Sequence, residues 1–148
     1  MITPQKQAFR HEPHKGIDGD CTRTCVAMLL GRPRDDVPHE HGTNTPEDYT
    51  AWKDRIAREF GVRFITIPLP EQDGWEIEHY CEWALGRGQG MPFMMGGESR
   101  NGTNHSVVID SDGRLIDPAI DSSGIIGPCT DGMFWFEWIV APVDRGDQ

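Results

Sequence analysis

The residue of this 148-residue chain that is best placed to do chemistry is Cys21, which directly follows a glycine-containing turn at residues 16–20. The apolar spacing that begins here predicts that Cys21 opens a helix. A thiol at a helix N-terminus lies at the positive end of the helix dipole, which favours the nucleophilic thiolate. The free backbone N–H groups of that turn can also stabilise an oxyanion. A small buried core residue would fit the same position, so Cys21 indicates catalysis only if it has partners.

His105 and Asp117 are the partners that a cysteine nucleophile would need. His105 stands at the entrance of one apolar run, and Asp117 follows the next short apolar run. A turn at Asp112 and Gly113 would join the two runs as a hairpin, whose antiparallel pairing brings His105 and Asp117 to the same edge of a sheet. A carboxylate there would hold the histidine in the tautomer that a general base requires. Each residue alone also fits a strand-end or turn role, but together with Cys21 they predict a Cys-His-Asp triad.

Two parts of the chain resemble a known family. The stretch Gly-Asp-Cys-Thr-Arg-Thr-Cys-Val-Ala-Met-Leu-Leu at 19–30, with Asp-Asp-Val-Pro-His soon after, resembles the opening of small papain-like cysteine hydrolase domains that phages often carry. These domains are similar to the peptidases that process bacteriocin leaders. The segments 99–109 and 115–118 resemble the family's histidine and aspartate segments. The resemblance covers roughly residues 16–143 and implies that Cys21 is the nucleophile, His105 the base and Asp117 the residue that orients the base.

The resemblance implies one papain-like domain over residues 1–143, with an extended arm at 1–19 and a polar tail at 144–148. It implies a cysteine hydrolase that needs no cofactor and cleaves an amide of a protein or peptide substrate. That amide could be a peptide bond, an isopeptide bond or a glutamine side chain, which corresponds to a peptidase, a deconjugase or a deamidase. A phage-encoded chain would act in the cytoplasm of its bacterial host. The alternative is a catalytically weak or inactive binding protein on the same fold that inhibits a host protein.

One position departs from the papain-like pattern. Such enzymes usually carry a glutamine a few residues before the nucleophile, and its side-chain amide completes the oxyanion hole. The sixth position before Cys21 is Lys15 in this sequence. Gln5 and Gln7 lie further upstream and are the oxyanion candidates, with Gln7 the better placed. The missing glutamine is the feature that keeps the binding-protein alternative open.

Hydrophobic periodicity predicts the elements that must position these side chains. One helix runs from Cys21 to Gly31 with Asp20 as its N-cap, and a second opens with Thr45 and Pro46. A third helix covers residues 77–85, and strands are expected at 62–67, 91–95, 106–109, 115–116 and 133–140. Helices first and strands later predict an α+β fold, with N-terminal helices packed on a mainly antiparallel C-terminal sheet.

The amino-acid composition limits the classes of binding partner and the cellular compartment that we expect. The chain has 14 basic and 24 acidic residues and a net charge of −10, which repels phosphate backbones and anionic lipid. We therefore expect neither nucleic acid nor a membrane as partner. Nothing approaches the roughly 18 consecutive apolar residues of a membrane span, and the N-terminus lacks the apolar core of a signal peptide. A cytoplasmic protein with four free cysteines is the expectation.

The glycine-rich run at 96–104 lacks the Gly-Lys-Ser/Thr of a phosphate loop. It predicts a mobile loop beside the active site that gates or binds substrate, with Gly97, Ser99 and Asn104 as candidate contacts. Substrate choice would depend on this loop and on residues 39–50.

A zinc site is the rival use for Cys21 and Cys25, which share one helical face. The early part of the chain adds four histidines, His11, His14, His39 and His41. No Cys-x2-Cys pair is present and the histidine spacing is irregular, so we expect no metal and interpret the histidines as solvated loop residues.

Overall fold

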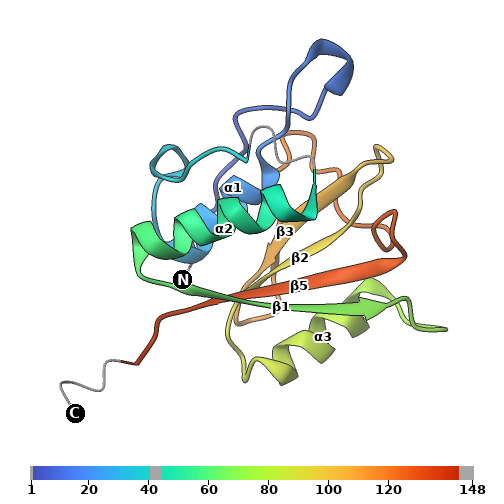
Figure 1. Ribbon diagram of the computed structural model, residues 1–148. Helices are drawn as coiled ribbons and strands as arrows, with labels where there is room; N and C mark the ends of the chain where they lie inside the picture. Colours follow the sequence, from blue (N-terminus) through green and yellow to red (C-terminus); the bar gives the residue numbers. More distant parts are fainter. Residues whose placement is uncertain (1, 41–44, 144–148) are drawn as a thin grey trace.

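The computed structural model of the chain describes residues 2–40 and 45–143. Within these residues, three α-helices pack on a five-stranded antiparallel sheet, which makes the fold α+β (Figure 1). The helices are α1 (Cys21–Leu30), α2 (Pro46–Phe60) and α3 (Ile77–Arg87). The strands are β1 (Arg63–Pro70), β2 (Phe93–Glu98), β3 (Asn104–Ile109), β4 (Leu115–Ile116) and β5 (Met133–Val140). Two short 3-10 turns cover Pro13–Lys15 and Arg34–Asp36.

The strands are ordered β1-β5-β2-β3-β4 across the sheet, and every neighbouring pair is antiparallel. β5 is the last strand in the sequence, yet it lies between β1 and β2. Helices α1 and α2 cover one face of the sheet, and α3 covers the other (Figure 1). The predicted α+β arrangement is therefore confirmed at this level.

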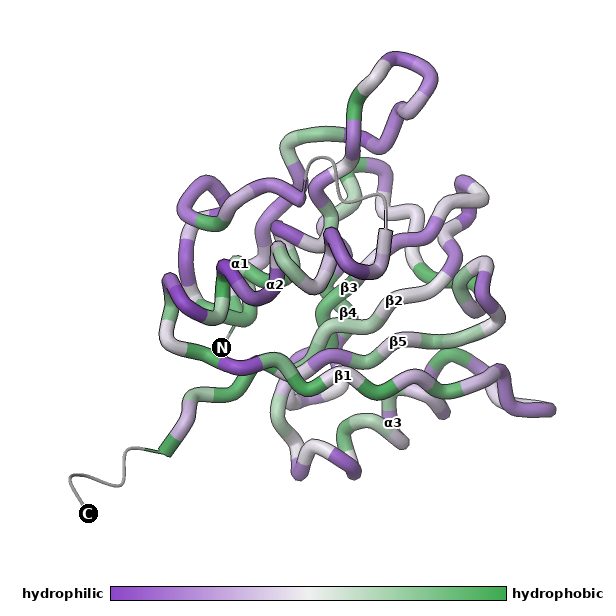
Figure 2. Tube along the Cα trace, in the orientation of Figure 1, coloured by the Kyte–Doolittle hydropathy of each residue, from purple (hydrophilic) through white to green (hydrophobic). Residues whose placement is uncertain are grey.

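The sheet separates two hydrophobic cores because its strands present apolar side chains to both faces. On one face, α1 and α2 pack on the sheet through residues such as Val26, Ile56 and Val108. On the other face, Tyr80 of α3 packs on Phe134 of β5 with ring centroids 4.1 Å apart. Figure 2 shows the resulting pattern, with hydrophobic colour along the strands and hydrophilic colour over much of the projecting turn near residues 10–19.

The ends of the helices follow the residue types that the sequence provides. The Thr45 side chain accepts a hydrogen bond from the Asp48 N–H and caps α2, and Pro46 occupies its first position, as predicted. Gly31 and Gly61 end α1 and α2 in the left-handed conformation that glycine adopts without strain. Among the described residues, no helix combines the length and the apolar character needed to cross a membrane.

β1 continues past the point where the sequence predicted its end. The strand was expected to close at Pro68, but it extends to Pro70. β1 is an edge strand that pairs only with β5, so proline residues without an N–H can be accommodated there.

Candidate active site

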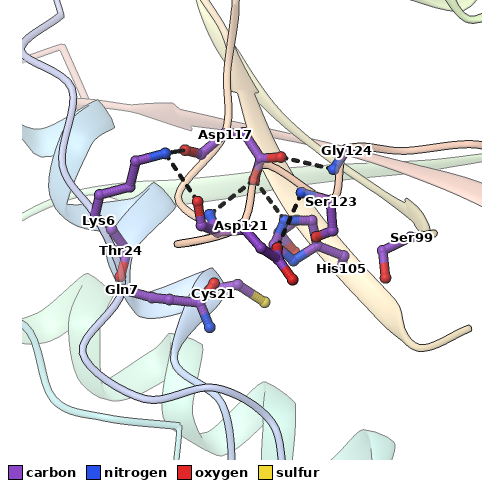
Figure 3. A network of polar contacts seen from close by, with 12 residues as sticks. Lys6, Gln7, Cys21, Thr24, Ser99, His105, Asp117, Asp121, Ser123 and Gly124 are labelled. Atoms are coloured by element: carbon purple, nitrogen blue, oxygen red, sulfur yellow. Dashed lines mark hydrogen bonds and ion pairs between the residues drawn. The ribbon is translucent and has the colours of Figure 1, made fainter. Parts of the chain in front are cut away.

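Cys21, His105 and Asp117 lie together where α1 meets the β3–β4 edge of the sheet (Figure 3). Cys21 is the first residue of α1, His105 is the second residue of β3, and Asp117 directly follows β4. The His105 Nε2 atom lies 2.7 Å from Asp117 Oδ1. Cys21 and His105 interact strongly enough to shift each other's pKa, and because Nε2 faces Asp117, Nδ1 is the ring nitrogen left for the thiol. The structure thus brings the three predicted residues together in the order thiol, imidazole, carboxylate.

The surroundings of Cys21 and His105 favour an ion pair between them. Burial acts to raise the pKa of the Cys21 thiol, but the hydrogen bond and charge of His105 outweigh it, with help from the Ser106 backbone N–H and the Thr22 hydroxyl. The pKa of Cys21 therefore lies below its ordinary value. Burial acts to lower the pKa of His105, whereas its contacts with Asp117 and Cys21 raise it to about 9. These directions favour a thiolate beside an imidazolium.

The other three thiols have the opposite character. Burial raises the pKa of Cys25 well above its ordinary value and raises the pKa of Cys81 and Cys129 to about 11. Cys25 is fully buried one turn after Cys21, in agreement with its expected place in the core. Cys21 is thus the thiol that the protein activates.

Asp117 is held firmly in its ionised form. Besides the contact with His105, its carboxylate accepts hydrogen bonds from the Ala119 N–H at 2.8 Å and the Gly124 N–H at 2.7 Å. Burial acts to raise the pKa of Asp117, but these three donors outweigh it and keep the pKa below its ordinary value. Because the carboxylate is fixed from three sides, it can orient the His105 ring.

Two carboxylates lie near the start of α1, and Asp20, the predicted N-cap, does not have the role that the sequence predicted. Asp20 occupies the N-cap position but does not cap the helix, because its carboxylate accepts from the N–H groups of Ala8 and Phe9 instead. Glu40 caps the helix instead, and its carboxylate accepts a hydrogen bond from the Arg23 N–H at 2.6 Å. Burial and the charge of Cys21 raise the pKa of Glu40 well above its ordinary value. Sequence reasoning missed Glu40, since only the path of the chain after α1 returns it to the helix start.

Gln7 is the glutamine that reaches the site. Its backbone N–H donates to the Pro118 carbonyl at 2.9 Å, and its side chain lies next to Cys21 (Figure 3). The side-chain Nε2 donates to the Phe9 carbonyl at 2.6 Å. The side-chain Oε1 is buried and has no hydrogen-bond partner among the described residues. Gln7 therefore remains the candidate for the oxyanion hole.

The prediction that Gln5 could contribute to the oxyanion hole is wrong. Its Nε2 donates to the Arg32 carbonyl at 2.7 Å, and its Oε1 accepts from the Arg34 N–H at 2.7 Å. These contacts place Gln5 beside the C-terminal end of α1, one helix length away from Cys21. Gln5 ties the N-terminal arm to the protein and cannot reach the thiol.

The N-terminal arm is hydrogen-bonded to the backbone beside the site. The Lys6 ammonium donates to the carbonyls of Asp117 and Ala119, at 3.0 and 2.9 Å. The described part of the arm therefore bridges α1 and the loop after β4. Residues 10–19 then turn back through the Glu12–Ile17 bridge and project from the body of the molecule (Figure 1).

A cleft of about 1130 Å³ opens at Cys21 and runs across the sheet face. Its walls come from the projecting turn and from α2, and its floor comes from β2, β3 and β5. The lining includes Arg10, His11, Tyr49, Lys53, Gly96, Ser106, Cys129, Trp135 and Glu137.

The predicted substrate loop is shorter than expected, because both ends of the glycine-rich run belong to strands. Ser99 and Asn104 line the cleft, but Gly97 does not. Gly97 belongs to β2, which continues to Glu98, so this part of the run is strand and not loop. The Ser99 N–H donates to the Thr103 carbonyl at 2.9 Å, which closes a tight turn between β2 and β3. The expected loop is therefore confined to residues 99–103, and the prediction that Gly97 contacts substrate is wrong.

Among the early histidines, His39 is packed more closely than a solvated loop residue, whereas His11 and His14 are exposed as expected. The His39 ring stacks on Phe9 with centroids 5.2 Å apart and lies within hydrogen-bond distance of the Gly19 carbonyl. His11 Nδ1 accepts from the Gly19 N–H. His41 lies outside the described residues. In the described part of the chain, no cluster of three or more His, Cys, Asp or Glu side chains could hold a metal ion.

Comparison with known protein families, with curated proteins and with solved structures found no match. The function must therefore rest on the chemistry of the site itself. That site combines an activated thiol, an imidazole, a fixed carboxylate and an open cleft.

Proposed function

We propose that the chain is a papain-like cysteine hydrolase that cleaves an amide of a protein or peptide substrate. The observation that carries the proposal is the alignment of Cys21, His105 and Asp117, in which the thiol is acidified and the imidazole is made more basic. The resemblance of residues 19–30, 99–109 and 115–118 to phage-borne papain-like domains supports it.

In the first half of the reaction, the Cys21 thiolate attacks the carbonyl carbon and forms a carbon–sulfur bond. The His105 imidazolium gives its proton to the leaving nitrogen as the carbon–nitrogen bond breaks, which leaves a thioester on Cys21. In the second half, neutral His105 takes a proton from water, and the resulting hydroxide displaces the thiolate. Asp117 keeps the ring aligned through both halves.

The negative charge that develops on the carbonyl oxygen needs donors. The Cys21 backbone N–H is the first donor, since it lies at the start of α1 where N–H groups point away from the helix. The Gln7 Nε2 is the second donor, because an amide nitrogen carries two hydrogens and only one is used by the Phe9 carbonyl. Gln7 would thus fill the role of the usual glutamine from a more distant sequence position.

The size of the cleft favours a polymeric substrate. At about 1130 Å³, the cleft exceeds the roughly 300–1,000 Å³ of typical small-molecule pockets. A cleft that crosses a sheet face can accept an extended chain, which fits a peptide or a protein segment.

The proposal is tested with p-nitrophenyl acetate, an activated ester that acylates a nucleophilic thiol and releases coloured p-nitrophenolate. We expect a burst of about one equivalent from the wild type, followed by slower turnover. Cys21→Ser should abolish the burst. Cys129→Ser, the control that changes the other thiol of the cleft, should preserve it. His105→Ala should slow both phases.

A peptide library treated with wild type and Cys21→Ser then identifies the amide by the new termini or the deamidated side chains. A wild type without a burst, or a burst that survives in Cys21→Ser, would overturn the hydrolase proposal and support the inactive binding protein.

A further inference from the structure

Two consecutive glycines, Gly96 and Gly97, lie in the interior of β2. β2 pairs with β3 on one side and with β5 on the other, so it is not an edge strand. Glycine weakens the interior of a strand, and its presence there often marks a close approach of another backbone or of a ligand. The presence of glycine at each of these two strand positions therefore needs a structural or functional explanation.

Packing within the fold explains Gly97. A Cβ atom at this position would lie 2.6 Å from the Gly127 carbonyl oxygen and 2.6 Å from Ile125 Cγ2. The Gly127 segment pairs with Glu98 through an isolated bridge, so backbone atoms occupy the space that a side chain would need. Gly97 is buried, and its role is structural.

Packing does not explain Gly96. A Cβ atom there would meet Trp135 Cβ at 3.5 Å, Cys129 Sγ at 3.9 Å and the His105 carbonyl at 3.9 Å, all of which are ordinary contact distances. Alanine would fit, and most residues would form a better strand than glycine. The face of Gly96 that lacks a side chain borders the cleft.

Gly96 also lies one strand away from the nucleophile. In the sheet it is paired with Ser106 of β3 on one side and with Trp135 of β5 on the other. The Ser106 hydroxyl lies 3.2 Å from the hydroxyl of Thr22, the residue that directly follows Cys21. The bare backbone of Gly96 is therefore the cleft floor beside the reacting atom, and the Trp135 side chain forms the wall beyond it.

We infer that Gly96 is a specificity-determining residue that keeps this floor clear, so that an extended polypeptide can cross the sheet from Ser106 to Trp135 while its carbonyl carbon meets Cys21. The inference rests on the proposed hydrolase function and names its substrate class as an extended main chain. A small electrophile needs only the sulfur, whereas a peptide needs the floor as well. A side chain at position 96 should therefore discriminate between the two.

The experiment measures how fast Cys21 is labelled by iodoacetamide and by acetyl-trialanine chloromethyl ketone, whose peptide part occupies the cleft. Wild type, Gly96→Ala and Gly96→Val are compared at pH 7, with the site of labelling read by peptide mass spectrometry. Iodoacetamide should label all three within about twofold. The peptidyl reagent should be slowed about tenfold or more by Gly96→Val and less by Gly96→Ala, as expected for one or a few added methyl groups in a substrate pocket.

Gly97→Ala is the matched control, since it adds the same methyl group to the opposite face of the same strand. We expect it to lower the melting temperature, because its Cβ would meet the backbone of Gly127, whereas Gly96→Ala should not lower the melting temperature. Should Gly96→Val fail to fold, Gly96→Ala still provides the comparison of the two reagents.

The outcomes separate the inference from the proposed function. Equal slowing of both reagents by Gly96→Ala or Gly96→Val would show a general effect on Cys21 and would overturn the inference. Unchanged labelling by the peptidyl reagent would overturn it too, because the substrate would then not cross position 96. If wild-type Cys21 reacts with iodoacetamide no faster than Cys129, the hydrolase proposal fails, and the inference fails with it.

Discussion

Replacement of His105 by alanine tests the ion pair on which the proposed chemistry depends. The variant removes the imidazole that faces Cys21 and leaves the thiol, the Ser106 N–H and the surrounding burial in place. Burial alone would raise the pKa of a thiol, so the Cys21 thiolate should become rarer at every pH below its new midpoint. We expect alkylation of Cys21 to slow, with its pH midpoint moved upward.

The size of the effect follows from the coupling between the two groups. The contacts of His105 with Asp117 and Cys21 raise its pKa from 6.5 to about 9. The Cys21 share of this shift acts in reverse on the thiol, because the coupling of two sites is reciprocal. Each pKa unit of stabilisation that the thiol loses makes the thiolate about tenfold rarer below its midpoint. A more basic thiolate is also more nucleophilic, with a Brønsted coefficient of about 0.4–0.5, and this recovers part of the loss. The net expectation is a Cys21 alkylation rate at pH 6 that falls about three- to fourfold for each unit by which the thiol pKa rises.

The assay is iodoacetamide alkylation from pH 5 to pH 9, read peptide by peptide in the mass spectrometer. Cys129 serves as the internal reference, since it lies in the same cleft and has a pKa of about 11. His39→Ala is the matched variant, because it removes a histidine that packs on Phe9 and is not part of the triad. Its Cys21 profile should match that of the wild type.

The reasoning would be refuted by a Cys21 profile that stays the same in His105→Ala and in the wild type. It would also be refuted if wild-type Cys21 reacted no faster than Cys129 at pH 6. Slowing of equal size in His39→Ala would point to a general loss of structure and not to a lost ion pair.

Three further predictions follow from the contacts of single side chains. Asp117→Asn should lower the free energy of unfolding at pH 7 by about 1–3 kcal/mol in a urea titration, because an amide nitrogen cannot accept from the Gly124 N–H; an unchanged midpoint would contradict this. The pKa of Glu40 is raised in the folded protein, so wild-type stability should fall as pH rises above its unfolded value of about 4.5 toward the folded pKa. Glu40→Gln removes that loss, and its melting temperature relative to wild type should therefore increase between pH 5 and pH 8; parallel curves would show that Glu40 does not titrate in this way. Gln7→Ala should reduce ester turnover by about 10²-fold with little change in Cys21 alkylation, whereas Gln5→Ala should reduce stability and leave turnover unchanged; the reverse pattern would exclude Gln7 from the oxyanion hole.

The triad geometry could be predicted from the sequence because each part of it depends on local rules. The start of α1 at Cys21 follows from apolar spacing, and the proximity of His105 to Asp117 follows from antiparallel pairing of two adjacent strands. The turn between these strands is longer than the Asp112 and Gly113 pair suggested, since Asp110 N–H bonds to the Arg114 carbonyl. That difference did not affect the outcome, because the strand register still brings the two ends together.

The remaining site residues depend on contacts between distant parts of the chain. Gln5 and Gln7 are two residues apart, and only the path of the arm decides that Gln7 reaches Cys21 while Gln5 reaches the other end of α1. Glu40 replaces Asp20 as the cap because the chain returns to the helix start after the turn at Arg34–Asp36. Gly97 resembles a loop residue in sequence, but the Gly127 backbone that excludes its side chain comes from a segment near the C-terminus.

The position of β5 determines when during synthesis the protein can fold. β5 is the last strand to leave the ribosome, yet β1 is joined to the rest of the sheet only through it. Until residues 133–140 emerge, β1 has no strand to pair with, and the cleft lacks Trp135 and Glu137. Such non-local pairing has a high contact order and is slow to form. The nascent chain thus exposes Cys21 early but cannot complete the cleft until residues 133–140 have been synthesised.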